Sequence, residues 1–250
     1  MLHLEINASE VAKVIGVNPF IEEEDAHRAV LMRHGVRFQN KTLREVTQTQ
    51  ASYVMSLVAT GVNQAAAAAS TGQEACAAVP PVERIKRVLG ATAEQAEKVH
   101  REISSRVVCT VGTRFEKPNI EAYEAERKVK VSRKQARVAQ QLPTPKGNVY
   151  TLKGRIDGYS EEDRCVEEFK NRKRRLFGII PGYELPQLYV YMALTNSAKA
   201  RQIESFGSEQ NVHHIDFDDD MWVCLMGQLG EAVDRMYAVA TAQQTLSGGS

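Results

Sequence analysis

The sequence has no run of about eighteen apolar residues, and this absence excludes a membrane-spanning helix. Residues 1–10 also lack the basic segment with which a secretory signal begins. We therefore expect an intracellular protein that is not secreted, resident in the cytoplasm or nucleus of a host cell. A membrane is not expected among its partners.

Cysteine is scarce and scattered. The 250 residues contain four cysteines, and no two of them form a CxxC pair. The six histidines include no HExxH pattern. This composition argues against a disulfide scaffold and against a zinc site built from neighbouring residues, and it favours reduced thiols.

The chain also lacks an excess of charge of one sign, because it has 32 Lys and Arg residues and 31 Asp and Glu residues, which gives a net charge of +1. The charges are unevenly placed, however. Basic residues gather in the segments 127–137 and 170–175, whereas 22–25 and 216–220 are acidic. Locally basic segments can bind DNA phosphates even when the whole chain is neutral. A solvated surface is the alternative explanation for either basic segment.

Hydrophobic periodicity indicates a mixed α/β protein. The pattern predicts helices at 7–16, 115–126, 186–195 and 221–243, and strands at 128–131, 136–140, 149–156, 165–169, 200–206 and 212–217. Residues 21–107 are predicted to be mainly helical, in several pieces, and 247–250 to be a flexible tail. This order favours a central mixed β-sheet flanked by helices, with a helical N-terminal insertion.

Two acids and a lysine form the most informative pattern. Asp157 ends one predicted strand, and Glu168 and Lys170 lie two positions apart on the next, so that both side chains leave the same face. If the two strands pair as a hairpin, the three side chains converge. Carboxylate oxygens select Mg²⁺ or Mn²⁺ over zinc, and the lysine would lie beside a metal-bound water. A hairpin with a surface salt bridge is the alternative.

Two further elements could complete such a site. Glu116 lies early in the predicted helix 115–126, where it is either a third carboxylate at the metal or a first-turn charge favoured by the helix dipole. Gln187 and Tyr191 are spaced i, i+4 and therefore share one helix face. They could orient the lysine or a phosphate, or Tyr191 could pack in the core beneath an exposed Gln187.

Taken in order, Glu116, Asp157, Glu168-x-Lys170 and Gln187-x-x-x-Tyr191 resemble the motifs of the PD-(D/E)xK nuclease superfamily, in its QxxxY branch. The chain looks most like the phage lambda exonuclease and YqaJ viral recombinase group, whose members also open with a segment like 8–16. The resemblance covers 7–20 and 108–240. It implies a restriction-endonuclease-like core and a single nuclease domain over 1–246, with 21–107 as a helical elaboration.

The resemblance also implies roles for the residues. Asp157 and Glu168 would ligate Mg²⁺, with Mn²⁺ as a substitute, Glu116 would bind directly or through water, and Phe169 would offer its backbone carbonyl. Lys170 would position the attacking water. The residues expected to contact DNA phosphates are Ser9, Arg155, Arg172, Lys173, Arg174 and Arg175. Some relatives carry an arginine shortly before the Ser9 position, and this arginine has no counterpart in the present sequence.

The implied activity is a Mg²⁺-dependent deoxyribonuclease, most simply a 5′→3′ exonuclease that acts on duplex ends in recombination or DNA processing. Its implied partners are DNA, a single-strand annealing protein and further copies of the chain in a ring-like homo-oligomer. A viral or phage origin follows from the same resemblance. Two alternatives remain open at the level of sequence: a structure-specific or flap endonuclease on the same core, and a catalytically inactive DNA-binding module.

Overall fold

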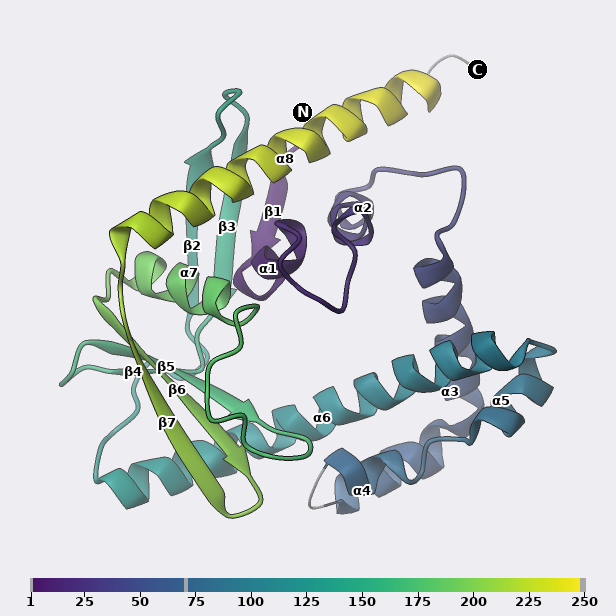
Figure 1. The fold of residues 1–250 in the computed structure, drawn as a ribbon, viewed down its shortest axis with the longest axis horizontal. Helices are drawn as coiled ribbons and strands as arrows, with labels where there is room; N and C mark the ends of the chain where they lie inside the picture. Colours follow the sequence, from purple (N-terminus) through teal and green to yellow (C-terminus); the bar gives the residue numbers. More distant parts are fainter. Residues whose placement is uncertain (1, 70–71, 248–250) are drawn as a thin grey trace.

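A computed structural model describes residues 2–69 and 72–247 and places two β-sheets side by side (Figure 1). The first sheet has three strands in the order β1-β3-β2, in which β1 is parallel and β2 antiparallel to the central strand β3. These strands are β1 (Leu4–Asn7), β2 (Arg137–Pro143) and β3 (Val149–Arg155).

The second sheet has four strands in the order β4-β5-β6-β7. Its strands are β4 (Gly158–Ser160), β5 (Cys165–Asn171), β6 (Lys199–Phe206) and β7 (Glu209–Asp216). The pair β5–β6 is parallel, and the other two pairs are antiparallel. The mixed α/β architecture predicted from the sequence is confirmed, but the strands are divided between two sheets.

The predicted hairpin between 149–156 and 165–169 is wrong. Both edges of β3 are already filled by β1 and β2, and the edge of β5 pairs with the short strand β4. The tight fit of Gly158 helps to explain the division, because a side chain there would overlap Val131 Cγ1. The chain therefore leaves the first sheet at Ile156 and enters the second sheet at Gly158.

Strand β1 precedes the predicted helix 7–16 and ends at Asn7, where a capping box with Glu10 begins the helical segment. Leu4 and Ile6 are fully buried and alternate with partly exposed residues, which is the period-two pattern of a strand. After it, a single 3-10 turn η1 (Ala8–Glu10) leads into the one-turn helix α1 (Val11–Val14). Only four residues carry this strand, too few for the periodicity to be recognised in the sequence.

Helices α7 (Leu185–Thr195) and α8 (Asp219–Ser247) cover the three-stranded sheet together with α1 and α2 (Glu23–Arg33). In Figure 1, α8 crosses the three strands, and α7 lies where the two sheets meet. Leu152, Leu188 and Leu229 are fully buried in the shared core. Ser247 is the last residue of α8, and the rest of the predicted tail, 248–250, lies outside the described residues.

The predicted insertion 21–107 divides in two: α2 packs in the main core, and the part from Leu43 onward forms an arm with its own hydrophobic core (Figure 1). Its helices are α3 (Leu43–Ala68), α4 (Gly72–Cys76), α5 (Val82–Leu89) and the first half of α6 (Ala93–Arg127). Capping boxes at Thr42 and Thr92 start α3 and α6. No helix in the described part of the chain combines the length and the apolar character needed to cross a bilayer.

Helix α6 is continuous where the sequence predicts two pieces. Gly112 does not interrupt it, and Pro118 lies inside it. Val107 belongs to the core of the arm, whereas Ile120 and Tyr123 pack against β5 and β6. Because the same helix is anchored at both ends, tertiary packing outweighs the local breakers. The end predicted for the helical elaboration, residue 107, consequently falls within α6. The predicted strand 128–131 is absent, and only an isolated bridge joins Ser132 to Tyr159.

Candidate active site

The three residues of the central motif do converge, although β3 and β5 lie in different sheets. Asp157 occupies the link between β3 and β4, where its Oδ2 accepts the backbone N–H of Phe169 at 2.9 Å. Glu168 and Lys170 leave the same face of β5, and Lys170 Nζ donates to Glu168 Oε1 at 2.6 Å. Beyond Glu167 the β4 ladder has ended, so this edge of β5 is open to Asp157.

Helix α7 closes the site from the other side. Gln187 Oε1 accepts a hydrogen bond from Lys170 at 3.1 Å, and Gln187 Nε2 donates to Glu168 Oε1 at 2.9 Å and to the Tyr191 hydroxyl at 3.0 Å. The Tyr191 hydroxyl donates in turn to the backbone carbonyl of Arg155 at 2.9 Å. The i, i+4 pair thus orients the lysine–carboxylate pair and ties it to the end of β3.

Gly154 makes this arrangement sterically feasible. A Cβ at this position would overlap Cε1 of Tyr191 and crowd Ala8. We expect Gly154→Ala to displace Tyr191, to destabilise the fold by about 1–3 kcal/mol through overpacking, and to lower any activity of the site roughly 100-fold. Urea denaturation and turnover measurements check this prediction.

Gly61→Ala provides the matched control, because Gly61 lies in α3 and a Cβ there meets nothing within 4 Å. This change should be neutral or stabilising by up to about 1 kcal/mol. Equal losses in the two variants would contradict the steric argument for Gly154.

Glu116 reaches the site through a residue that the sequence did not single out. Gln135 donates from Nε2 to Glu116 Oε1 and, at 3.4 Å, to Asp157 Oδ1. Gln135 therefore links the helix carboxylate to the motif carboxylate. Its backbone has a positive φ of 60°, in a loop without periodicity, and nothing in the sequence marks it.

Burial dominates the electrostatics of the cluster. Desolvation raises the pKa values of Glu116, Asp157 and Glu168, and repulsion among these carboxylates adds to the effect. For Lys170, burial alone would lower the pKa, but the Glu168 carboxylate, with Glu184 and Asp157, raises it. The site therefore holds a charged ammonium among carboxylates that are costly to ionise.

The donor set fits a hard divalent cation. The Oε2 atom of Glu168 is buried and has no hydrogen-bond partner, so one carboxylate oxygen remains available for a ligand. Phe169 directs its N–H toward Asp157, and the N–H and C=O of one strand residue point to the same edge. The Phe169 carbonyl is thus directed to the same place. Oxygen donors of this kind suit Mg²⁺ or Mn²⁺.

The carboxylates do not form a ready cage, however. Within 2–69 and 72–247, no three Asp, Glu, His or Cys side chains stand together as a group that could hold a metal ion. Glu116 is engaged by Gln135, and one oxygen of Glu168 by Lys170. This geometry favours two direct carboxylate ligands and a water-mediated role for Glu116.

A groove of 610 Å³ runs beside the cluster and contains two of the predicted phosphate-binding residues, Ser9 and Arg155. Asp157, Gln187 and Tyr191 lie along the same groove. Arg137 from β2, which ends the basic segment 127–137, lines it as well, and so does Lys153 from β3, which the sequence analysis did not single out and which is paired with Glu5. Arg137 is paired with Arg155 across the two strands, and this register could not be derived from sequence spacing.

The prediction that Arg172 contacts phosphate is wrong. Arg172 is buried, and its guanidinium donates to Glu204 at 2.9 Å and to Glu184 at 2.7 and 3.0 Å. It lies at the start of residues 172–184, here called the connecting loop, which joins β5 to α7. Its neighbours Arg174 and Arg175 are exposed and Lys173 is partly exposed, so these three can still reach a polyanion.

The Glu204 carboxylate gives the fold a specific acid sensitivity. Burial alone would raise its pKa, but the N–H groups of Phe177 and Gly178, together with His213 and Arg172, lower it to about 2. A lowered folded pKa stabilises the fold above the unfolded value of 4.5 and loses this contribution as pH falls toward 2.

We therefore expect the stability advantage of the wild-type protein over Glu204→Gln to shrink by up to about 3 kcal/mol between pH 6 and 2. Urea unfolding at several pH values measures this difference. A gap that stays constant with pH would contradict the depressed pKa.

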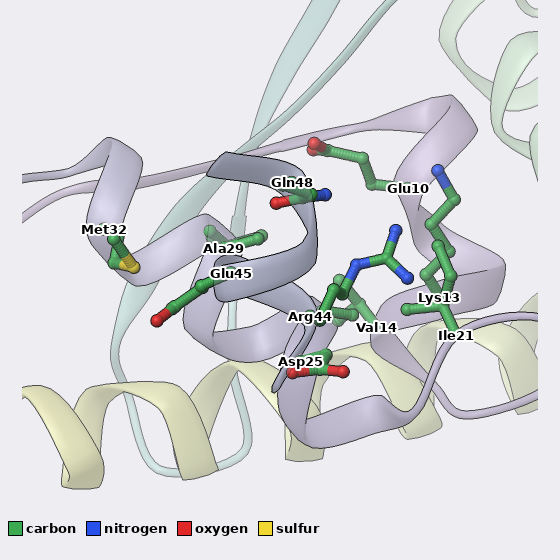
Figure 2. A pocket seen from close by; sticks show the side chains of 12 residues that line it. Glu10, Lys13, Val14, Ile21, Asp25, Ala29, Met32, Arg44, Glu45 and Gln48 are labelled. Atoms are coloured by element: carbon green, nitrogen blue, oxygen red, sulfur yellow. The ribbon is translucent and has the colours of Figure 1, made fainter. Parts of the chain in front are cut away.

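A second hollow lies between α1, α2 and the start of α3 (Figure 2). None of the predicted site residues lines it. Two acidic residues in its lining already have structural partners, because Glu10 pairs with Arg33 and Glu45 with Arg28. Lys13, Asp25 and Arg44 also line this hollow, but none of the carboxylates, the lysine or the amide of the predicted motifs does.

Comparison with known proteins agrees with this architecture. No sequence-family model and no curated protein matches the chain. Among solved structures, an alkaline exonuclease (LHK-Exo) from Laribacter hongkongensis is similar, with a TM-score of 0.55 and 10% identity, over 98% of this chain and 93% of that one. The same enzyme in complex with dAMP gives a TM-score of 0.51 and 12% identity, over 97% and 93%.

A phage-related exonuclease from Haemophilus somnus shows a TM-score of 0.44 at 12% identity, over 99% of this chain and 97% of that one. At such identities the likeness concerns the fold alone. The two LHK-Exo structures extend it over nearly the whole length, arm included. The chain therefore has the fold of an alkaline exonuclease.

Proposed function

We propose that the protein is a metal-dependent deoxyribonuclease that hydrolyses DNA phosphodiester bonds. The observation that carries the proposal is the buried Glu168–Lys170 pair, with Asp157 beside it and one Glu168 oxygen lacking a partner. A surface salt bridge would not be buried, would not be held by Gln187, and would not border a basic groove.

Each residue has a definite task in this chemistry. Asp157 and Glu168 would hold Mg²⁺, or Mn²⁺ in its place, with the Phe169 carbonyl as a further donor and Glu116 acting through water. The metal would polarise the scissile phosphate and supply a reactive water. The Lys170 ammonium would donate a hydrogen bond that orients this water, and Gln187, which accepts from Lys170, holds the ammonium in place. Tyr191 fixes Gln187 and is anchored on the Arg155 carbonyl.

The groove supports the choice of DNA as substrate. Ser9 is exposed in η1 and lines the groove together with the basic residues Arg137 and Arg155, and with Lys153, which is paired with Glu5. Phosphate groups bind to hydroxyl, backbone N–H and basic groups of this kind. Lys173, Arg174 and Arg175 offer a second set of contacts on the connecting loop.

Action on duplex ends, in the 5′→3′ direction, is the finer part of the proposal. The likeness to an alkaline exonuclease, solved also in complex with dAMP, supports exonuclease action. The preference for duplex ends and the 5′→3′ direction rest on the motif resemblance. A role in recombination beside a single-strand annealing protein, and assembly of several copies into a ring, belong to the same proposal.

The test uses linear duplex DNA labelled at either end, incubated with Mg²⁺, Mn²⁺ or EDTA, with closed circular duplex DNA as companion substrate. We expect metal-dependent release of mononucleotides from the linear substrate only, with early loss of the 5′ label. Cleavage of the circle would instead indicate an endonuclease. Binding to either DNA without cleavage in both metals would contradict the enzymatic proposal and leave a DNA-binding module.

A further inference from the structure

The connecting loop joins the two halves of the site. It follows β5, which carries Glu168 and Lys170, and it precedes α7, which carries Gln187. The contact of 3.1 Å between Lys170 and Gln187 therefore depends on how this loop is held. Most of its residues lie near the surface, so its position must come from a few buried contacts.

Glu204 of β6 supplies most of these contacts. Its side chain is fully buried. Its Oε2 accepts the Phe177 N–H at 3.0 Å and Arg172 Nε at 2.9 Å, and its Oε1 accepts the Gly178 N–H at 2.9 Å and contacts His213 Nε2 at 3.0 Å. Through these hydrogen bonds the Glu204 carboxylate holds the start and the middle of the connecting loop against the second sheet.

Arg172 extends the same network to the end of the loop. Its two terminal nitrogens bind both oxygens of Glu184, at 2.7 and 3.0 Å, and Gln202 donates to Glu184 at 2.8 Å. Glu184 directly precedes α7, three positions before Gln187. A bidentate ion pair fixes orientation as well as distance. Arg172 therefore fixes the position of the first turn of α7 relative to β6.

From this geometry we infer that Glu204 is a positioning residue of the proposed nuclease site, acting through Arg172 and Glu184 to set Gln187 against Lys170. The inference rests on the proposed function. Glu204 does not line the groove, and although it lies opposite Lys170 in the β5–β6 register, the side-chain hydrogen bonds of its carboxylate go to the connecting loop, Arg172 and His213. Glu204 would affect catalysis indirectly, because it sets the distance between β5 and α7.

The test compares Glu204→Gln with Asp234→Asn. Asp234 is the matched control because it is another buried carboxylate that holds a loop: its partners Thr144, Asn148 and the N–H of Lys146 belong to the turn between β2 and β3, not to the connecting loop. Each variant is measured in the wild-type background and in a Gln187→Ala background, at a temperature where all are folded. Hydrogen exchange at the Phe177 and Gly178 amides is followed in parallel.

We expect Glu204→Gln to lower kcat at least 10-fold, in line with the cost of small misplacements, and to lose protection of both amides. In the Gln187→Ala background the same change should cost less than about twofold, because residues that act as a unit are not additive. Asp234→Asn should leave kcat and these amides unchanged.

Equal losses in the two backgrounds, or unchanged kcat despite lost protection, would overturn the positioning role. If Glu204→Gln does not fold, Gly178→Ala replaces it: the φ of Gly178 is +76°, so a side chain strains the loop without removing a buried charge, and the same non-additivity is expected. A wild-type protein that cleaves no DNA would overturn the proposed function and the catalytic role with it, while amide exchange would still report whether Glu204 holds the loop.

Discussion

Lys170→Met is expected to reduce DNA cleavage about 1,000-fold, within the range for loss of a group that handles the reacting water. Methionine is similar in length and keeps the apolar contacts of the lysine stem, but it cannot donate the bonds to Glu168 and Gln187. The fold should persist, because the raised pKa of Glu168 allows this carboxyl to take up a proton when its partner is lost. Single-turnover cleavage of linear duplex DNA, with circular dichroism of both proteins, measures the effect.

Lys98→Met is the matched control for this substitution. Lys98 pairs with Glu94 on the exposed surface of the arm, and such pairs contribute little. Its activity should equal that of the wild-type protein. If Lys170→Met kept more than about a tenth of the activity, lysine would not act on the reacting water.

Asp157→Asn is expected to abolish metal-dependent cleavage and, at the same time, to leave the metal-free protein at least as stable. Burial and the neighbouring Glu116 make a negative charge at Asp157 unfavourable, as its raised pKa shows. An amide removes this charge, and its oxygen can still accept the Phe169 N–H. The free energy of unfolding of the metal-free protein at neutral pH should therefore rise rather than fall.

Thermal unfolding with and without Mg²⁺ separates the two effects. Since a ligand stabilises the state that binds it, Mg²⁺ should raise the Tm of the wild-type protein and leave that of Asp157→Asn unchanged. Asp216→Asn, at the exposed end of β7, should respond to Mg²⁺ as the wild-type protein does. An Asp157→Asn protein that is still stabilised by Mg²⁺ would mean that the metal binds elsewhere.

The local part of the site was predictable from the sequence. Two residues on one face of a strand, or four apart on a helix, have a fixed relation whatever the fold around them, and Glu168 with Lys170 and Gln187 with Tyr191 follow this rule. The fold class was predictable for a similar reason, because each long element carries its own periodicity.

The non-local part could not be derived in this way. Arg172 reads as one more charge in a basic run, and only the folded chain brings Glu184 and Glu204 to it. Gln135 becomes relevant because a loop with positive φ places it between Glu116 and Asp157. The hairpin prediction failed because pairing depends on which strand edges remain open, and strand β1, distant in sequence, had already filled one.

Because helix α6 is uninterrupted, the arm and Glu116 belong to one helix, and Glu116 lies close to Ile120, the point at which this helix is anchored on the second sheet. At 1.5 Å per residue, Glu116 lies about 6 Å from Ile120, where the helix is anchored on the second sheet, whereas Ala93 lies about 40 Å away. A swing of about 5 Å at the far end would therefore move Glu116 by less than about 1 Å. A rigid tilt of the arm about Ile120 would therefore leave the carboxylate beside the cluster nearly still.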